Sequence, residues 1–262
     1  MPLTVSQEPD RERARELAER GTILRSLVGS TVHGLANAGT DDRDEMGVCV
    51  EPREYVLGLR RFEHYVFRTQ DEGVPSGPGD LDLTIYGLRK YARLALKGSP
   101  TTLLLLFAPD DAIVARTPLG EELQALAPAF VSKRTARAFL GYVDAQRRGL
   151  AGERHATRRR ELSAQHGYDT KYAMHALRIA VQGRELLTTG RITLPVPEPD
   201  RSRLMDVRRG EVPLPDVLTD LHAAVAALEE LAVTADVPES ADVAAVDAFL
   251  VRAYERAWAG GL

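Results

Sequence analysis

GSTVHGLANAGTDDRDEMGV, residues 29–48, is the stretch that decides the fold, because it joins one apolar run to a second run headed by acidic residues. The first run, residues 22–28, ends at the glycine-serine pair that opens the stretch. In the second run Met46, Val48 and Val50 occupy every other position. Alternation with a period of two is typical of a strand. The pattern predicts a strand, a turn into a short helix, and a second strand that begins at the acidic residues.

Two aspartates, Asp42 and Asp44, stand at the head of the second strand. Side chains two residues apart on a strand point to the same face, so these carboxylates form a pair. Like charges held side by side repel unless a cation neutralises them, and such hard oxygen ligands suit Mg²⁺ or Mn²⁺. Asp82, entering the apolar segment 81–86, is the best candidate for a third ligand, since an adjacent strand could place it beside the pair. Spacing alone leaves a solvated acidic loop or a helix cap open.

The Gly29-Ser30 turn is a second candidate ligand site in this stretch. A turn between a strand and a helix lets a ligand approach the backbone closely, and it offers amide groups and a hydroxyl to a phosphate chain. Glycine-serine pairs are also common turn formers. The dipeptide by itself therefore predicts a turn, and phosphate binding depends on its neighbours.

Outward from this stretch, the chain divides into a mixed half and a helical half. Alternating residues predict further strands at 63–68 and 81–86, and helical spacing predicts helices at 9–20 and 87–97. After Pro118 the expected helices are 119–126, 132–147, 170–188, 217–233 and 241–259, with the proline-rich segment 192–199 as an exposed connection. We therefore expect an α+β protein, with a mixed-sheet domain at 1–112 and an all-helical domain at 113–262.

Composition favours a protein that folds in water around an ample core, with 44% hydrophobic residues in 262. A membrane-spanning helix needs roughly 20 apolar residues, and the run Leu103–Phe107 is far too short. The amino-terminal residues are polar and carry both charge signs, which predicts a cytoplasmic protein without a signal peptide. The only cysteine, Cys49, lies in an apolar run and is expected to be a buried structural thiol.

Net charge is only −4, yet the charges are unevenly distributed. Residues 133–160 contain nine basic and two acidic residues, whereas residues 211–262 contain ten acidic and two basic ones. A basic segment of this kind can mark the place where a polyanion binds. An arginine-rich helix face in contact with solvent is the alternative.

The predicted helix at 170–188 has an unusual polar stripe. Lys171, His175, Arg178 and Gln182 fall at i, i+4, i+7 and i+11, which places them on one helix face. Asp169, just before the helix, is a candidate N-cap. The stripe is either a face in contact with solvent or a cationic surface for an anionic ligand.

A glycine-serine turn, a short helix and an Asp-x-Asp pair at the head of a strand resemble the signature of nucleotidyltransferases of the DNA polymerase beta superfamily. Three blocks resemble, in order and spacing, the RlaP-type group of RNA-repair-associated nucleotidyltransferases. They are GSTVHGLANAGTDDRDEMGV, then LDLTIYGLRKYARLALKGSP followed by LLLLF, then HGYDTKYAMHALRIAVQGRELLTTGRI. The resemblance spans residues 29–192 and implies the mixed sheet of that superfamily followed by a helical lobe.

Carried over position by position, the resemblance makes Asp42 and Asp44 ligands of two metal ions, Mg²⁺ or Mn²⁺. Asp82 would bind the ion that activates the attacking group, and Gly29 and Ser30 would hold the β- and γ-phosphates. The implied reaction is attack by a hydroxyl on the α-phosphate of a nucleoside triphosphate, with ATP the expected substrate and pyrophosphate released.

The resemblance also implies roles for the polar stripe, with Lys171 and Arg178 contacting phosphates and His175 orienting the nucleotide or bonding within the lobe. Asp41 stands where the family often has serine, and its role is open. The expected acceptor is an RNA end, such as that of a transfer RNA. A protein hydroxyl, or an inactive RNA-binding protein of the same fold, are the alternatives. The arginines expected to hold the RNA backbone are Arg147, Arg148, Arg154, Arg158, Arg159 and Arg160.

Overall fold

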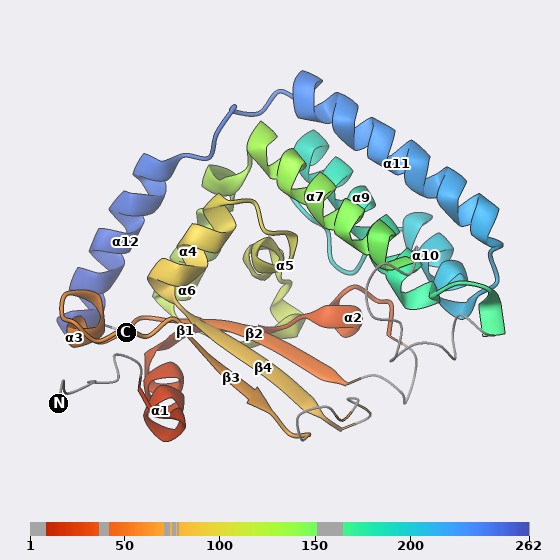
Figure 1. Cartoon of the computed structure of the whole chain (residues 1–262). Helices are drawn as coiled ribbons and strands as arrows, with labels where there is room; N and C mark the ends of the chain where they lie inside the picture. Colours follow the sequence, from red (N-terminus) through yellow and green to blue (C-terminus); the bar gives the residue numbers. More distant parts are fainter. Residues whose placement is uncertain are drawn as a thin grey trace, which may run out of the picture. The chain divides into compact units, whose positions relative to one another are not determined.

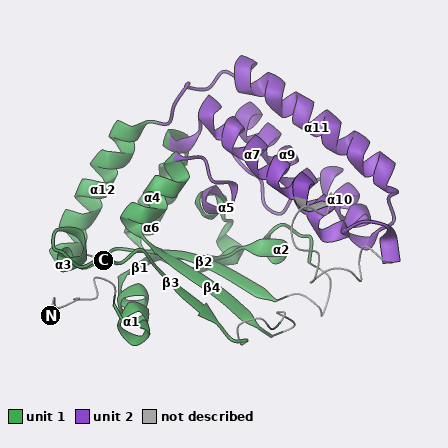
Figure 2. Cartoon of the chain, viewed as in Figure 1, with its two compact units in different colours: residues 1–96, 104–129, 242–262 green, residues 97–103, 130–241 purple. Residues whose placement is uncertain are grey.

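The computed structural model of the chain describes residues 9–36, 42–70, 74, 77, 79–150 and 165–261 (Figure 1). These residues form two compact units (Figure 2). The first unit comprises residues 1–96, 104–129 and 242–262, and the second comprises residues 97–103 and 130–241. The units do not coincide with the expected segments 1–112 and 113–262, because residues 113–129 and 242–262 belong to the unit that contains the sheet.

The first unit is built on a five-stranded mixed sheet with the strand order β3-β4-β2-β1-β5. Its strands are β1 (Thr22–Leu27), β2 (Arg43–Cys49), β3 (His64–Arg68), β4 (Leu81–Gly87) and β5 (Ile113–Arg116). Strands β2 and β4 pair in parallel, and the other neighbouring strands pair antiparallel. The sheet with its flanking helices confirms the predicted α+β class.

Four of these strands were predicted, β1 from its apolar run and the other three from alternation, and β5 was missed. Its four residues IVAR contain no buried side chain, so the sequence has no alternating apolar pattern there. Pairing with β1 creates the strand, because Leu24 and Arg25 lie opposite Arg116 and Ala115. The hydroxyl of Ser26 also donates to the carbonyl of Ala112 at 3.0 Å, just before β5.

One face of the sheet is covered by α1 (Arg11–Gly21) and forms a hydrophobic core. Residues of the alternating strands that point to this face include Leu83 and Ile85 of β4, which cluster with Leu17 of α1. Cys49 lies in the same cluster and is buried, as expected, and burial raises the pKa of its thiol. Figure 1 shows α1 and α4 (Leu88–Leu96) on opposite sides of the sheet.

The remaining helices of the first unit are short, except the last one. They are α2 (Gly29–Val32), α3 (Arg53–Val56), α6 (Pro118–Ala125) and α12 (Val243–Trp258), with 3₁₀ turns at Leu104–Phe107 and Asp110–Ala112. Leu104, Leu105 and Leu106 are buried, so the short apolar run is a buried turn of helix in the core.

The second unit is helical, with α5 (Pro100–Leu103), α7 (Lys133–Leu150), α9 (Thr170–Thr189), α10 (Asp200–Arg209) and α11 (Leu214–Thr234). Helix α9 is the centre of this unit and packs on α7, α10 and α11. Gly183 of α9 allows close packing, because a Cβ there would lie 2.8 Å from the Phe139 ring of α7 and 3.1 Å from Leu228 of α11.

Two expectations for the second unit were wrong. Helix α10 was missed, because its sequence DRSRLMDVRR is highly charged and follows several prolines. The segment 192–199 was expected to be exposed, but Ile192, Leu194 and Val196 are buried while the residues between them are exposed. The apparent linker therefore contributes alternate side chains to the core, with Thr193 and Pro195 exposed between them. No helix in the described part of the chain is both long and apolar enough to cross a membrane.

Glu51 joins α12 to the sheet through a buried hydrogen-bond network. The hydroxyl of Tyr254 donates to its carboxylate at 2.6 Å, and the backbone N–H of Leu88 donates to the same carboxylate at 3.0 Å. The Trp258 indole N–H donates to the Glu51 carbonyl at 3.0 Å. Burial raises the pKa of Glu51, and the hydrogen bonds from Tyr254 and Leu88 to its carboxylate partly offset this rise. A residue two positions after the end of β2 therefore fixes α12.

We predict that Glu51→Gln makes the stability of the protein less dependent on pH. Because the pKa of Glu51 is raised on folding, ionisation costs more in the folded chain than in the unfolded one. The free energy of unfolding of the wild type should therefore fall as pH rises from about 4.5 through the raised pKa. Urea unfolding measured over this pH range should show a steeper fall in the free energy of unfolding for the wild type than for Glu51→Gln. Parallel pH profiles for the two proteins would contradict the prediction.

Candidate functional site

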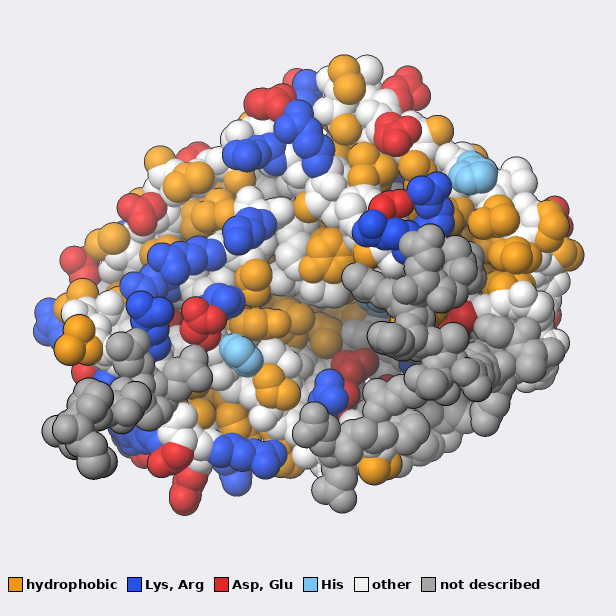
Figure 3. Space-filling model, in the orientation of Figure 1, with side chains coloured by type: hydrophobic (Ala, Val, Ile, Leu, Met, Phe, Trp, Pro, Cys, Tyr) orange, Lys and Arg blue, Asp and Glu red, His pale blue; other side chains and the backbone are white. Residues whose placement is uncertain are grey.

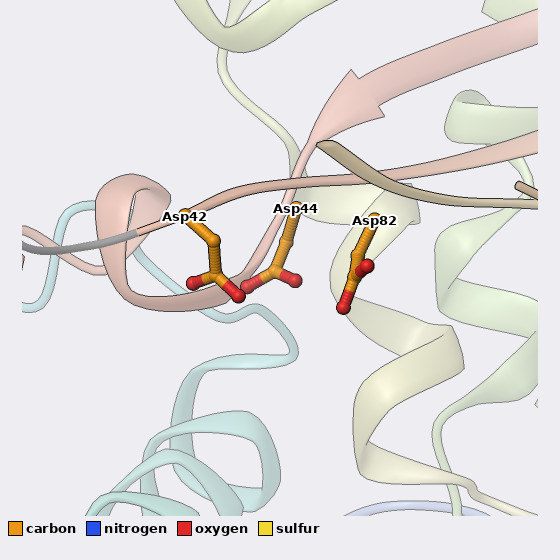
Figure 4. Close-up of side chains that lie close together, drawn as sticks. All are labelled: Asp42, Asp44 and Asp82. Atoms are coloured by element: carbon orange, nitrogen blue, oxygen red, sulfur yellow. The ribbon is translucent and has the colours of Figure 1, made fainter. Parts of the chain in front are cut away.

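The pairing of β2 with β4 brings three carboxylates together. Asp44 lies directly opposite Asp82 in the parallel register, and Asp42 precedes Asp44 by two residues. All three side chains are half-buried, and one carboxylate oxygen of each lies within 4.8 Å of the others. Figure 4 shows the three carboxylates pointing the same way from adjacent strands. The structure therefore assembles the three aspartates that the sequence singled out.

The donor set fits a hard divalent cation. Three carboxylates supply only oxygen ligands and a charge near −3, which is the chemistry that Mg²⁺ and Mn²⁺ prefer. Without a cation the three charges repel one another across a short distance. The arrangement can therefore hold metal ions at the end of the sheet where β2 and β4 begin.

Gly29 lies against the carboxylate of Asp44. Its backbone is left-handed, with φ +69°, and a Cβ there would lie 2.0 Å from Oδ2 of Asp44. The N–H of Val28 donates to the Asp44 carbonyl at 2.9 Å, which fixes the turn to β2. Ser30 follows within the first turn of α2. The turn predicted to bind phosphate is thus adjacent to the carboxylates, and only glycine fits at its first position.

Two polar residues next to Asp82 were missed by the sequence reasoning. The Nε2 group of Gln70 donates to Oδ1 of Asp82 at 2.9 Å, and Nε of Arg68 lies 3.5 Å from the same oxygen. Arg68 stands opposite Asp82 in the antiparallel β3–β4 register. The contact between Arg68 and Asp82 could be predicted only from the strand register, because alternation identified β3 but not which of its residues pairs with Asp82.

The opposite side of β2 carries a separate charge cluster. Glu45 is only 3% exposed and is paired with Arg25 of β1 and with Arg43, whose Nε lies 2.5 Å from its carboxylate. Strand alternation places Glu45 on the other face from Asp42 and Asp44. The described acidic residues of this stretch therefore lie on opposite faces of β2: Glu45 is paired with arginines on one face, and Asp42 and Asp44 lie beside Asp82 on the other.

The polar stripe of α9 is divided between surface and interior. Lys171 is exposed and His175 is half-buried, whereas Arg178 is 5% and Gln182 is 3% exposed. The guanidinium of Arg178 donates to Oε1 of Gln182 at 3.1 Å and lies 3.0 Å from Nδ1 of His175. Burial lowers the pKa of Arg178 to about 10, so it remains charged at neutral pH. Neither of the two alternatives, a face in contact with solvent or a cationic surface, describes the whole stripe, because α7, α10 and α11 pack around α9 and two of the four side chains are buried.

The N-cap of α9 is confirmed. The Asp169 carboxylate accepts hydrogen bonds from the backbone N–H groups of Lys171 and Tyr172, both at 3.0 Å. Of the arginines expected to hold RNA, Arg147 and Arg148 are exposed on α7, and they pair with Asp144 at 2.9 and 3.5 Å. The others, Arg154, Arg158, Arg159 and Arg160, lie outside the described residues, as does Asp41.

Comparison with known proteins identifies the family to which this chain belongs. Residues 7–257 match the model of the family described as RlaP, RNA repair pathway DNA polymerase beta family. The mixed sheet with three carboxylates beside a glycine-serine turn is thus that of a nucleotidyltransferase of the DNA polymerase beta superfamily. Because the match covers nearly the whole chain, the protein belongs to the RlaP family.

No curated protein matches the chain. Among solved structures, the chain is similar to a nucleotidyltransferase-like protein from Exiguobacterium sibiricum, with 13% sequence identity and a TM-score of 0.29. The similarity covers 86% of this chain and 74% of that one.

Replacing Gly29 by alanine should disturb the carboxylate site. The new methyl group must displace the Asp44 carboxylate, and a shift of about 1 Å in a catalytic group can cost on the order of 100-fold in rate. Gly190→Ala is the matched control, because Gly190 has φ +75° but nothing within 4 Å of the place where its Cβ would lie. Both variants bear similar backbone strain, so a nucleotide-transfer assay should show the loss only for Gly29→Ala. Equal activities would contradict this assignment.

Proposed function

We propose that the protein transfers a nucleoside monophosphate from a nucleoside triphosphate, with ATP the expected donor, to a hydroxyl at an RNA end, releasing pyrophosphate. The observation that carries the proposal is the cluster of Asp42, Asp44 and Asp82 on one sheet face beside Gly29. Family membership supports both the transferase class and a nucleic-acid acceptor. The activity is of the EC 2.7.7 type, and the expected location is the cytoplasm.

In this proposal Asp42 and Asp44 would hold two Mg²⁺ or Mn²⁺ ions, and Asp82 would hold the one that activates the attacking group. Bound metal ions would neutralise charge on the attacking and leaving oxygens of an in-line displacement. The chain contributes positioning: Gly29 and Ser30 place the β- and γ-phosphates next to Asp44. Arg68 and Gln70 hold the Asp82 carboxylate in its orientation.

The helical unit supplies further anion contacts in this proposal. Lys171 is exposed and contacts phosphate directly, and His175 orients the nucleotide. Arg178 is too deeply buried for a surface contact, so we assign it to holding His175 through the 3.0 Å interaction with Nδ1. The six arginines of the basic segment would hold the RNA backbone: Arg147, Arg148, Arg154, Arg158, Arg159 and Arg160.

Removing any one carboxylate should abolish nucleotide transfer. We expect Asp42→Asn, Asp44→Asn and Asp82→Asn each to lower the rate more than about 100-fold, since each removes a ligand for the ions that stabilise transition-state charge. Asp247→Asn, on the exposed side of α12, makes the same charge change away from the site. The assay incubates the protein with each labelled triphosphate, Mg²⁺ or Mn²⁺, and total RNA or cell extract.

The labelled product in that assay decides between acceptors. Label on RNA supports the proposal, whereas label on a protein would show that the acceptor is a protein hydroxyl instead of an RNA end. Absence of incorporation by the wild type with any triphosphate would leave an RNA-binding protein of the same fold and would overturn the proposal.

Divalent cations should stabilise the folded protein through the same carboxylates. Binding at about 100 times the dissociation constant adds about 2.7 kcal/mol to the free energy of unfolding. Thermal denaturation should therefore show a Tm that rises with Mg²⁺ or Mn²⁺ in the wild type and in Asp247→Asn. Asp44→Asn should lose that response. An equal rise in Tm for Asp44→Asn would place the cation elsewhere.

A further inference from the structure

A polar and aromatic surface extends from the carboxylates along the open face of β3 and β4. We call it the β3–β4 face and define it as His64, Val66, Thr84, Tyr86, Lys90 and Arg93. His64 and Arg93 are exposed, Val66 is 43% exposed, and Thr84 and Tyr86 are half-buried. The surface therefore has side chains that a partner can reach.

Strand register makes this face continuous with the metal-ligand cluster. Arg68 pairs with Asp82, Val66 with Thr84, and His64 with Tyr86, and residues two apart share a face. The last pair lies four residues from Asp82, which is about 13 Å at about 3.3 Å per residue. A short extended chain that begins at the carboxylates can therefore reach the aromatic pair.

The far end of the β3–β4 face combines rings with cations. The rings of His64 and Tyr86 lie 6.1 Å apart, centre to centre, at an interplanar angle of 43°. Lys90 follows at the start of α4, with its Nζ 2.8 Å from Glu63, and Arg93 lies one turn further on the same helix face. Figure 3 shows Lys and Arg side chains gathered in the region of α4.

The order of groups across the sheet gives this face a direction. The Gly29–Ser30 turn follows β1 and lies on one side of Asp44, while Asp82 of β4 lies on the other. If the turn holds the β- and γ-phosphates, pyrophosphate leaves toward β1. In-line displacement requires the attacking hydroxyl to enter from the opposite side, which is the side of Asp82 and β3.

We propose that the β3–β4 face binds the terminal nucleotides of a single-stranded RNA acceptor and directs its terminal hydroxyl to Asp82. This inference rests on the proposed function and adds the acceptor's path. One base stacks on the His64–Tyr86 pair, and the backbone phosphates contact Lys90 and Arg93. Stacking of bases on aromatic rings beside cationic side chains is a common way in which proteins hold single strands.

Charge reversal of the two cations tests the path. The double variant Lys90→Glu with Arg93→Glu should bind a fluorescent single-stranded RNA of about ten nucleotides with a Kd at least tenfold higher than that of the wild type. The salt dependence of binding should also become weaker. The slope of log Kd against log salt concentration should fall by about 1 to 2, because two phosphate contacts are lost. The affinity for ATP with Mg²⁺, measured by calorimetry, should stay as in the wild type. The matched control is Arg11→Glu with Arg20→Glu, which makes the same charge change on exposed positions of α1, behind the sheet.

His64→Ala provides a second test that leaves the cations in place. It should reduce nucleotide transfer to an ordinary RNA end but not to an RNA whose terminal residues lack bases, because only the stacking contact is removed. Wild-type RNA affinity in Lys90→Glu with Arg93→Glu would overturn the inference, as would an equal loss in the α1 control. The inference would also be overturned if the protein transferred nucleotides to DNA or protein and neither the charge-reversed variant nor His64→Ala changed the rate of that transfer.

The two proposals fail separately in these experiments. If the wild type incorporates no nucleotide, the proposed function fails, while the RNA-binding measurements still decide whether the β3–β4 face holds a strand. If transfer to RNA is normal in the charge-reversed variant, the proposed function stands and the inferred path is wrong.

Discussion

The parallel pairing of β2 with β4 is the constraint on which the candidate site depends. It places Asp44 directly opposite Asp82, and alternation along β2 adds Asp42 on the same face. Three carboxylates within 4.8 Å repel, so the sheet must supply the energy that holds them together. Its buried face does so, because Leu83 and Ile85 of the same strand pack against α1. Hydrophobic burial behind the sheet thus supports the charge cluster in front of it.

Strand alternation separates two kinds of acidic group in one short segment. Glu45 faces away from the site and is neutralised by Arg25 and Arg43, so it strengthens the pairing of β1 with β2. Asp42 and Asp44 face the open side. Gly29 can approach Asp44 only because it lacks a side chain. The Gly29–Ser30 turn and the carboxylates therefore become neighbours through the backbone geometry of the turn between β1 and β2.

The helical unit shows how far a periodic pattern can be interpreted. The stripe of polar residues on α9 is real, but a helix surrounded by α7, α10 and α11 has little free surface. Arg178 is therefore an interior group, bonded to Gln182 and close to His175, and Lys171 alone of the four is exposed. Helical spacing predicts which residues share a face. It does not predict whether that face meets solvent or another helix.

Local patterns in the sequence determined four strands, most of the long helices, the cap at Asp169 and the identity of the three aspartates. These features follow from alternation, helical spacing and the chemistry of carboxylates, all of which act over a few residues. Tertiary structure alone decided the existence of β5, the helix α10, the burial of Arg178 and the contacts of Arg68 and Gln70 with Asp82. It also decided that residues 242–262 belong with the sheet, through Glu51 and Tyr254. Each of these depends on pairing between residues far apart in the chain, which a local pattern does not encode.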